Sequence, residues 1–220
     1  MKIGVLALQG AFIEHINMIN KINQQNCPSL LFNQSNNFAF SSFKLQIECV
    51  EIRRPEDLTE IDALIIPGGE STVQGLLLRK SGLFNSIKKL IESGMPVLAT
   101  CAGLILLAKE IENESSAHLQ TFPIKVVRNA YGRQLGSFCS TANVGEIKDF
   151  PLVFIRAPYI KECLSPDVTV LCKDKDRIVA AQYKNQFVYA FHPEMSDDTR
   201  IHEEFIKAVF KYSSKKLLAG

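Results

Sequence analysis

A cysteine interrupts an apolar run in the segment from Pro96 to Leu106, "PVLATCAGLIL". The residues before it are typical of a short buried strand and those after it of a helix start, so Cys101 would occupy the turn between them. Small residues at 99, 102 and 103 would allow the tight backbone of a nucleophile elbow. The helix N-terminus would favour the thiolate, and the Ala102 amide could donate to a developing oxyanion.

A histidine and a carboxylate end another apolar run, "VYAFHPEM". Residues two apart project to the same side of an extended segment, and Pro193 would hold the residue before it extended. Glu194 would then accept a hydrogen bond from one ring nitrogen of His192. The other nitrogen would take a proton from Cys101, which is the logic of a catalytic triad in its cysteine form.

Each of these features also has a structural alternative. Free cysteine is among the most buried residue types, so Cys101 could be a core residue. His192 could simply end a strand, with Glu194 exposed to solvent. The remaining histidines are weaker candidates for the base, because they fall on amphipathic helices or in a polar loop: His15, His202 and His118.

Adjacent glycines follow a third apolar run in "IIPGGES", Ile65 to Ser71. Glycine lets a ligand approach the backbone closely, and exposed amides can bind a carbonyl oxygen or a carboxylate. Ser71 is a suitable N-cap for a following helix. Turns also use glycine for geometry alone, so the segment predicts a binding loop only together with the other two features.

The segments that carry these residues predict an α/β fold. Apolar runs alternate with amphipathic stretches: "KIGVLAL" then "AFIEHINMINKI", "DALIIPGG" then "STVQGLLLRK", and "PVLAT" then "AGLILLAKEI". Such alternation is typical of a three-layer fold, in which a mostly parallel sheet is flanked by helices. After about residue 120 we expect added antiparallel strands joined by hairpins: "IKVVRNAY", "LVFIRAPYI", "VTVLCK", "RIVAAQY" and "QFVYAFH". "TRIHEEFIKAVFKY" would be a final helix.

Composition limits the class of protein. The 220 residues are 46% hydrophobic and carry a net charge of +2, which predicts one domain over 1–220 with its own core. The polar stretch 24–42 is interpreted as a surface insertion before a strand at "LQIECVEI". Basic residues form no stripe, and no apolar run approaches about 20 residues, so we expect neither nucleic acid nor membrane as a partner. The six cysteines form no CxxC pair and lack the spacing of a zinc site. We therefore expect a cytoplasmic protein whose thiols are mostly reduced and which binds no metal.

Six segments together resemble one protein family over nearly the whole chain: "LALQGAFIEH", "PGGEST", "TCAGLILLAKEI", "RNAYGRQ", "FIRAP" and "FHPE". In this order they resemble the glutaminase subunits of pyridoxal phosphate synthases, class I (triad) glutamine amidotransferases of vitamin B6 biosynthesis with a flavodoxin-like sheet. The resemblance implies that Cys101 attacks the side-chain amide of L-glutamine to give a glutamyl thioester. It makes His192 the base that later protonates ammonia, and Glu194 the residue that orients His192. It implies no cofactor.

The resemblance also assigns residues to the substrate. It matches the following positions to glutamine binding: Gly69, Glu70, Ser71, Arg128, Ile155 and Arg156. It matches Gly68, Gly69 and Ala102 to the oxyanion hole. Without the motifs, each arginine would be interpreted as an ordinary surface ion pair, which contributes about 0–1 kcal/mol.

The family resemblance implies a partner as well. Ammonia would pass through a tunnel into a barrel-shaped synthase subunit within a large heteromeric complex, and the glutaminase would be nearly silent until docked. The segment with Gln9 and Gly10 would lie near that interface. Two departures from the family pattern are Ala99, where glycine is usual, and Cys139, where an acidic residue is common; we expect the elbow to tolerate alanine.

Three interpretations remain open at this point. The chain could be an active glutaminase of the B6 synthase, an amidotransferase domain for another acceptor, or a non-catalytic subunit that keeps the fold for assembly. "RNAYGRQ" disfavours the second, and the intact Cys101, His192 and Glu194 disfavour the third. A cysteine protease of similar architecture has no sequence feature in its favour.

Overall fold

The structure is a computed structural model and describes residues 1–25, 47–128 and 137–219. The predicted insertion at 24–42 lies outside the described residues except for its first two positions, and so does "RNAYGRQ" apart from Arg128. The described strands form a ten-stranded sheet in the order β2-β1-β3-β4-β12-β11-β9-β6-β5, with β10 paired to β11, and a separate two-stranded sheet, β7-β8.

The first five strands of that order are parallel to one another. They and the helices between them have these bounds: β1 Lys2–Leu6, α1 Phe12–Gln25, β2 Glu48–Ile52, η2 Pro55–Leu58, β3 Ala63–Ile66, α2 Ser71–Lys80, α3 Leu83–Glu92, β4 Val97–Thr100, α4 Ala102–Leu107 and β12 Gln186–Tyr189. All residues of β3 and β4 are buried, as expected for central strands that are covered on both faces.

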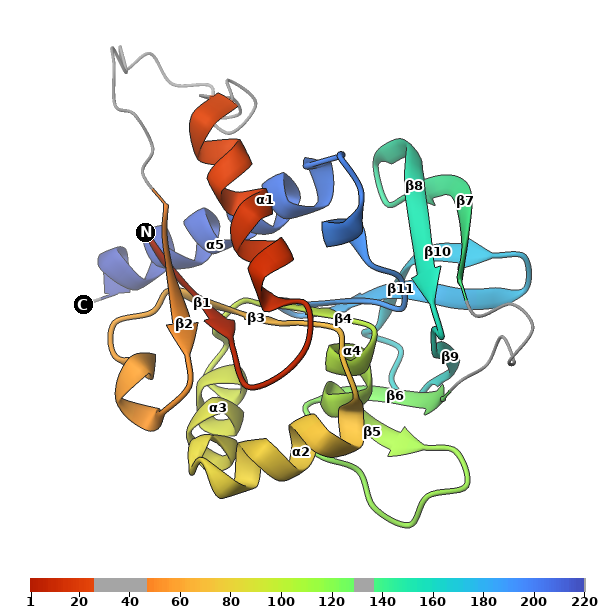
Figure 1. Cartoon of the computed structure of the whole chain (residues 1–220), viewed down its shortest axis with the longest axis horizontal. Coiled ribbons are helices and arrows are strands. Elements are labelled where there is room, and N and C mark those ends of the chain that lie inside the picture. Colours follow the sequence, from red (N-terminus) through yellow and green to blue (C-terminus); the bar gives the residue numbers. More distant parts are fainter. Residues whose placement is uncertain (26–46, 129–136, 220) are drawn as a thin grey trace.

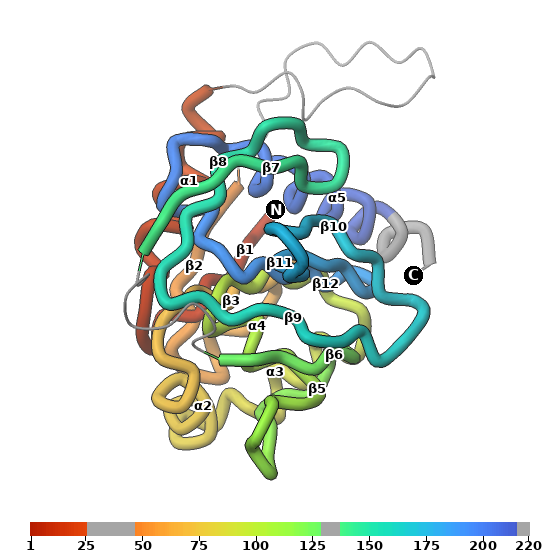
Figure 2. The backbone as a smooth tube through the Cα atoms, turned by 90° about the vertical axis from the view of Figure 1, so that its right-hand side faces the viewer, coloured from red at the N-terminus to blue at the C-terminus, as the bar shows by residue number. Residues whose placement is uncertain are grey.

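Helices cover both faces of the parallel strands. α1 and α5 (Arg200–Ala219) lie on one side of the sheet, and α2 and α3 lie on the other (Figure 1; Figure 2). The core between these layers is one cluster of buried aliphatic and aromatic side chains that extends through all three layers. The predicted three-layer α/β arrangement is therefore confirmed.

The chain after α4 adds the remaining strands, most of which pair in antiparallel fashion, whereas β5 is parallel to β6. They are β5 Ala108–Ile111, β6 Phe122–Val127, β7 Ser137–Val144, β8 Ile147–Ile155, β9 Tyr159–Cys163, β10 Thr169–Asp174 and β11 Arg177–Tyr183, with the short 3-10 helix η3 at Pro193–Met195. Hairpins join β7 to β8, β10 to β11 and β11 to β12. The expectation of added hairpin strands after residue 120 is confirmed.

Two details of the prediction were wrong. The helix predicted through "AGLILLAKEI" ends at Leu107, and its last four residues form β5, which pairs with β6 in parallel. Alanine, lysine and glutamate favour helix locally, but pairing with a neighbouring strand overrides that preference. β7 was missed, since its sequence "SFCSTANV" is polar and becomes a strand through its ladder with β8.

Gly103 sets how closely α4 approaches the sheet. A Cβ atom at this position would lie 2.3 Å from the carbonyl oxygen of Ile66, which is a backbone atom of β3. We predict that Gly103→Ala lowers the free energy of unfolding by about 1–3 kcal/mol, because α4 must move away from the sheet. Urea denaturation measures this. Asn85→Ala on the exposed side of α3 is the control and should change stability by less than about 0.5 kcal/mol.

None of the helices in the described ranges combines the length and the apolar character that crossing a membrane requires. The cysteines within those ranges are free thiols: Cys49, Cys101, Cys139, Cys163 and Cys172.

Candidate active site

Cys101 occupies the turn between β4 and α4 in a strained backbone conformation. Its φ is 47° and its ψ is −101°, a positive-φ conformation that a residue with a side chain rarely adopts. Two backbone hydrogen bonds hold it there, from Cys101 N to Tyr189 O at 2.7 Å and from Ile105 N to Cys101 O at 3.3 Å. The predicted elbow is therefore present, with a side chain that is 7% exposed.

His192 lies beside this elbow because β12 pairs with β4. The register places Tyr189 opposite Thr100, so the segments that leave these two strands start at the same edge of the sheet. His192 Nδ1 is 2.8 Å from Glu194 Oε1, and the His192 amide donates to Val153 O at 2.8 Å. The expected contact is present, but its explanation was wrong: Pro193–Met195 is a 3-10 turn rather than an extended segment.

The protonation of this pair follows from its contacts. Burial alone would lower the pKa of His192, but hydrogen bonds with Cys101 and Glu194 outweigh it and raise the pKa to about 10. Burial alone would raise the pKa of Glu194, yet the neighbouring His15 and His192 rings hold it at about 2. Glu194 is therefore ionised and favours a protonated His192, as a triad carboxylate does.

The glycine loop after β3 lies against the same imidazole. The Gly68 N–H donates to Thr100 Oγ1 at 2.9 Å, and the Gly68 carbonyl accepts from Ala11 N at 3.0 Å. A Cβ atom on Gly68 would lie 2.3 Å from His192 Cε1 and 3.3 Å from Cys101 Cβ. Gly68 is thus packed on His192 and Cys101, whereas Gly69 is exposed at the surface beside them.

The residues after the glycines form a charged cluster at the start of α2. Glu70, rather than the predicted Ser71, is the N-cap, because its longer side chain reaches Thr72 N and Val73 N while Ser71 is already helical. Arg128 donates to Glu70 Oε1 at 3.1 Å and to Glu114 Oε1 at 2.8 Å. Two of the predicted glutamine contacts, Glu70 and Arg128, are therefore paired with each other.

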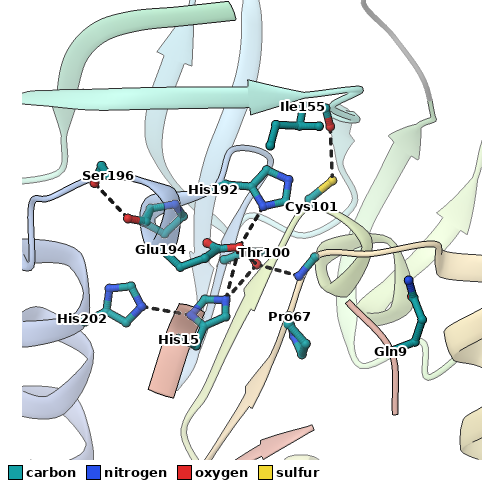
Figure 3. A network of polar contacts seen from close by, with 12 residues as sticks. Gln9, His15, Pro67, Thr100, Cys101, Ile155, His192, Glu194, Ser196 and His202 are labelled. Atoms are coloured by element: carbon teal, nitrogen blue, oxygen red, sulfur yellow. Dashed lines mark hydrogen bonds and ion pairs between the residues drawn. The ribbon is translucent and has the colours of Figure 1, made fainter. Parts of the chain in front are cut away.

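The end of β8 completes the surroundings of the thiol. Cys101 Sγ lies 3.9 Å from the carbonyl oxygen of Ile155, to which the thiol can donate (Figure 3). The side chains of Ile155 and Arg156 are exposed. Ala102 is the first residue of α4, directly after Cys101. Within the described ranges, no three histidine, cysteine or acidic side chains are grouped as metal ligands.

Comparison with known families gives this geometry a context. The profile of the SNO glutamine amidotransferase family matches residues 5–211, which is nearly the whole chain. The chain belongs to this family.

Relatives of the SNO family member described here share its full length. The protein called pyridoxal 5'-phosphate synthase subunit PdxT in Desulfitobacterium hafniense is 46% identical over 210 residues, which are 95% of this chain and 94% of that protein. The PdxT of Streptococcus pneumoniae is 43% identical over 211 residues, covering 94% and 96%. A crystal structure of a glutamine amidotransferase is 35% identical with a TM-score of 0.80, covering 94% and 98%. The PurLQS structure from Thermotoga maritima, at 16% identity and a TM-score of 0.57 over 98% of both chains, shares the fold alone.

Two histidines of this SNO family member were not predicted to belong to the site. His15 and His202 are fully buried and lie behind Glu194, on the side away from Cys101 (Figure 3). Helical spacing could have indicated their burial. His15 begins the buried set that continues with Met18, Ile19 and Ile22, and His202 begins a set with the same spacing: Phe205, Ile206 and Val209.

Burial keeps both rings neutral. It lowers the pKa of His15 in spite of the nearby Glu194 carboxylate. It lowers the pKa of His202 to about 3, with His15 acting in the same direction. Neutral rings carry one N–H each, which limits the directions of the hydrogen bonds that they can make.

His202 should make the SNO family member less stable in mild acid. Its pKa is about 3 in the folded chain against 6.5 when unfolded, so between these values only the unfolded chain takes up the proton and stability falls as the pH falls. From pH 6.5 to pH 5 this costs about 2 kcal/mol. Glu194 contributes little there, since its stabilisation is lost only as the pH falls from 4.5 towards 2.

Urea denaturation of wild type and His202→Gln at the two pH values isolates this effect. We expect the variant to lose about 2 kcal/mol less than the wild type between pH 6.5 and pH 5. An equal loss in both proteins would contradict the assignment of this acid sensitivity to His202.

Proposed function

We propose that this chain is the glutaminase subunit of a pyridoxal phosphate synthase and hydrolyses L-glutamine to L-glutamate and ammonia with the triad Cys101, His192 and Glu194. The observation that carries the proposal is the meeting of an elbow cysteine with a buried His192–Glu194 pair, in which Nδ1 and Oε1 are 2.8 Å apart. Membership of an amidotransferase family and the PdxT names of full-length relatives support the choice of substrate and pathway.

The chemistry would proceed through a thioester. Cys101 Sγ, as thiolate, attacks the carbon of the glutamine side-chain amide, and the resulting oxyanion collapses as the C–N bond breaks. His192 gives its proton to the departing nitrogen, which leaves as ammonia. A water molecule, deprotonated by His192, then attacks the thioester; glutamate leaves and the thiol is restored. Glu194 remains ionised and holds the ring through Nδ1.

The remaining predicted residues would bind the substrate and the oxyanion. We assign the oxyanion to the amides of Gly69 and Ala102. The Gly68 amide, the third candidate, donates to Thr100 here and would serve only after that hydrogen bond breaks.

Glutamine would lie above the thiol, between two exposed segments that border it. The residues that we assign to its binding are Gly69, Glu70 and Ser71 from the loop after β3, Ile155 and Arg156 from the end of β8, and Arg128. Because Arg128 already pairs with Glu70, the two would act on the substrate together.

We further propose a barrel-shaped synthase subunit as the partner that receives the ammonia. A channelled product would explain why a glutaminase belongs to a synthase at all, since free ammonia is mostly protonated at neutral pH and then cannot act as a nucleophile. The free thiols in the described ranges fit the cytoplasm, where cysteines stay reduced.

The proposal is tested by measuring glutamate release from glutamine. The purified chain is assayed alone and with its cognate synthase subunit. We expect release that rises strongly on adding the synthase and requires glutamine. No release in either mixture, with the two subunits still bound to each other, would instead favour a structural role for this chain.

A further inference from the structure

A continuous set of buried polar contacts runs from the triad to the last helix. His15 Nδ1 lies 3.0 Å from His202 Nε2, and His15 Nε2 lies 3.2 Å from Thr100 Oγ1 and 3.5 Å from Glu194 Oε1 (Figure 3). All four side chains are buried, with an exposure of 5% or less. The triad mechanism assigns no task to His15 or His202, so their place directly behind the carboxylate needs an explanation.

Thr100 determines the direction of these hydrogen bonds. Its Oγ1 accepts the Gly68 N–H at 2.9 Å and donates its only hydrogen to Glu194 Oε1 at 3.4 Å. In the contact with Thr100, the hydrogen must therefore be on His15 Nε2. A neutral His15 then has a bare Nδ1, which accepts the Nε2–H of His202.

The opposite direction is disfavoured by two buried groups. If Thr100 donated to His15 instead, the lone pair of Nε2 would face the ionised carboxylate 3.5 Å away. His202 would also have to carry its hydrogen on Nδ1, which has no hydrogen-bond partner in the described part of the chain. A buried donor without a partner is costly, whereas a bare ring nitrogen is tolerated more easily.

Glu194 depends on these contacts for its orientation. Its Oε2 is buried without a hydrogen-bond partner among the described residues, and the side chains of His192, Thr100 and His15 all meet its Oε1. Among the described residues, no hydrogen bond to Oε2 holds the carboxylate against rotation. The groups behind Oε1 therefore decide whether that oxygen faces His192.

We propose that His15, held in one tautomer by His202, is a positioning residue for glutamine hydrolysis: its Nε2–H donates to Thr100 Oγ1 and lies beside Glu194 Oε1, and together with the Thr100 hydroxyl it holds that oxygen against His192 Nδ1. The inference rests on the proposed function. His15 touches neither substrate nor thiol, so its loss would misplace the base during proton transfer without weakening substrate binding.

Two substitutions of His15 separate positioning from packing. Glutamine can place its amide nitrogen near the Nε2 position, whereas asparagine reaches only the Nδ1 position. In the complex with the synthase, we expect His15→Asn to lower kcat roughly tenfold to a hundredfold with KM within about twofold, and His15→Gln to retain kcat within about threefold. Gln186→Leu is the control. It removes a part-buried hydrogen-bonded pair with Thr121 at the far end of β12 and should lower the melting temperature without changing kcat.

A second measurement needs neither partner nor turnover. Iodoacetamide reacts with the thiolate, so the alkylation rate of Cys101, followed by peptide mass spectrometry at neutral pH, reports on the His192–Glu194 pair directly. We expect slower alkylation in His15→Asn and a near wild-type rate in His15→Gln. Unchanged kcat and alkylation in both variants, with lower melting temperatures, would overturn the inference. The same alkylation pattern without any glutamate release from the wild type would support positioning and refute the proposed function.

Thr100→Val provides an independent test if His15→Asn folds poorly. Valine keeps the shape of threonine and removes the hydroxyl that links His15 to Glu194. Because both residues act on the same oxygen, we expect the double variant with His15→Asn to lose little more kcat than the larger single loss. Losses that multiply would show independent roles and overturn the proposal.

Discussion

Replacing Cys101 by alanine should abolish glutamine hydrolysis while the chain still folds and binds its partner. The thiol supplies the bond-forming atom, and removal of a triad nucleophile lowers kcat by about a millionfold in a comparable hydrolase. Cys101 is buried, but alanine keeps its Cβ atom and removes only the sulfur, so the loss of packing is small. Glutamate release measures the loss, and co-purification with the synthase subunit measures docking. Residual turnover near the wild-type rate would mean that another group is the nucleophile.

Cys101→Gly should separate the chemistry from the backbone strain. The conformation at φ 47° and ψ −101° costs about 1–3 kcal/mol for a residue with a Cβ atom and little for glycine. Glycine also makes the unfolded chain more flexible, which lowers the free energy of unfolding by about 0.5–1 kcal/mol and offsets part of this gain. We therefore expect an inactive Cys101→Gly that is more stable than Cys101→Ala by about 1 kcal/mol in urea denaturation. Equal stability of the two variants would show that the elbow is not strained.

Gly68→Ala should inactivate the enzyme without removing any reactive atom. The new Cβ would lie 2.3 Å from His192 Cε1, and the loop cannot retreat easily because Thr100 and Ala11 hold its two sides. The imidazole would have to move by about an ångström, and a misplacement of this size costs roughly a hundredfold in rate. We expect kcat to fall by this factor or more, with KM changed far less.

A remote glycine provides the control for that experiment. Gly82 has a φ of 76° at the start of α3, and the nearest atom to an added Cβ is Pro55 Cγ at 3.6 Å. Gly82→Ala should therefore destabilise the chain by about 1 kcal/mol through strain and leave kcat unchanged. If Gly68→Ala and Gly82→Ala had the same kinetics, the contact between Gly68 and His192 would be irrelevant to catalysis.

The sequence determined the parts of this protein that depend on local chemistry. Continuous apolar runs predicted β3 and β4, since only strands covered on both faces have no polar side. Small residues around Cys101 predicted the elbow, and the His192–Glu194 spacing predicted a pair of which only the backbone geometry was wrong. Because these features involve neighbours in the chain, residue types and spacing were sufficient to find them.

Tertiary structure alone decided the parts that depend on pairing between distant segments. "AKEI" became β5 and "SFCSTANV" became β7 because partner strands supplied their hydrogen bonds. Local preference could not indicate either. His15 and His202 are 187 positions apart, and each by itself looks like a polar residue on an amphipathic helix. Helical spacing can indicate that each ring is buried, but not that the two meet behind Glu194. They meet there because α1 and α5 pack on the same face of the sheet, and burial lowers their pKa values.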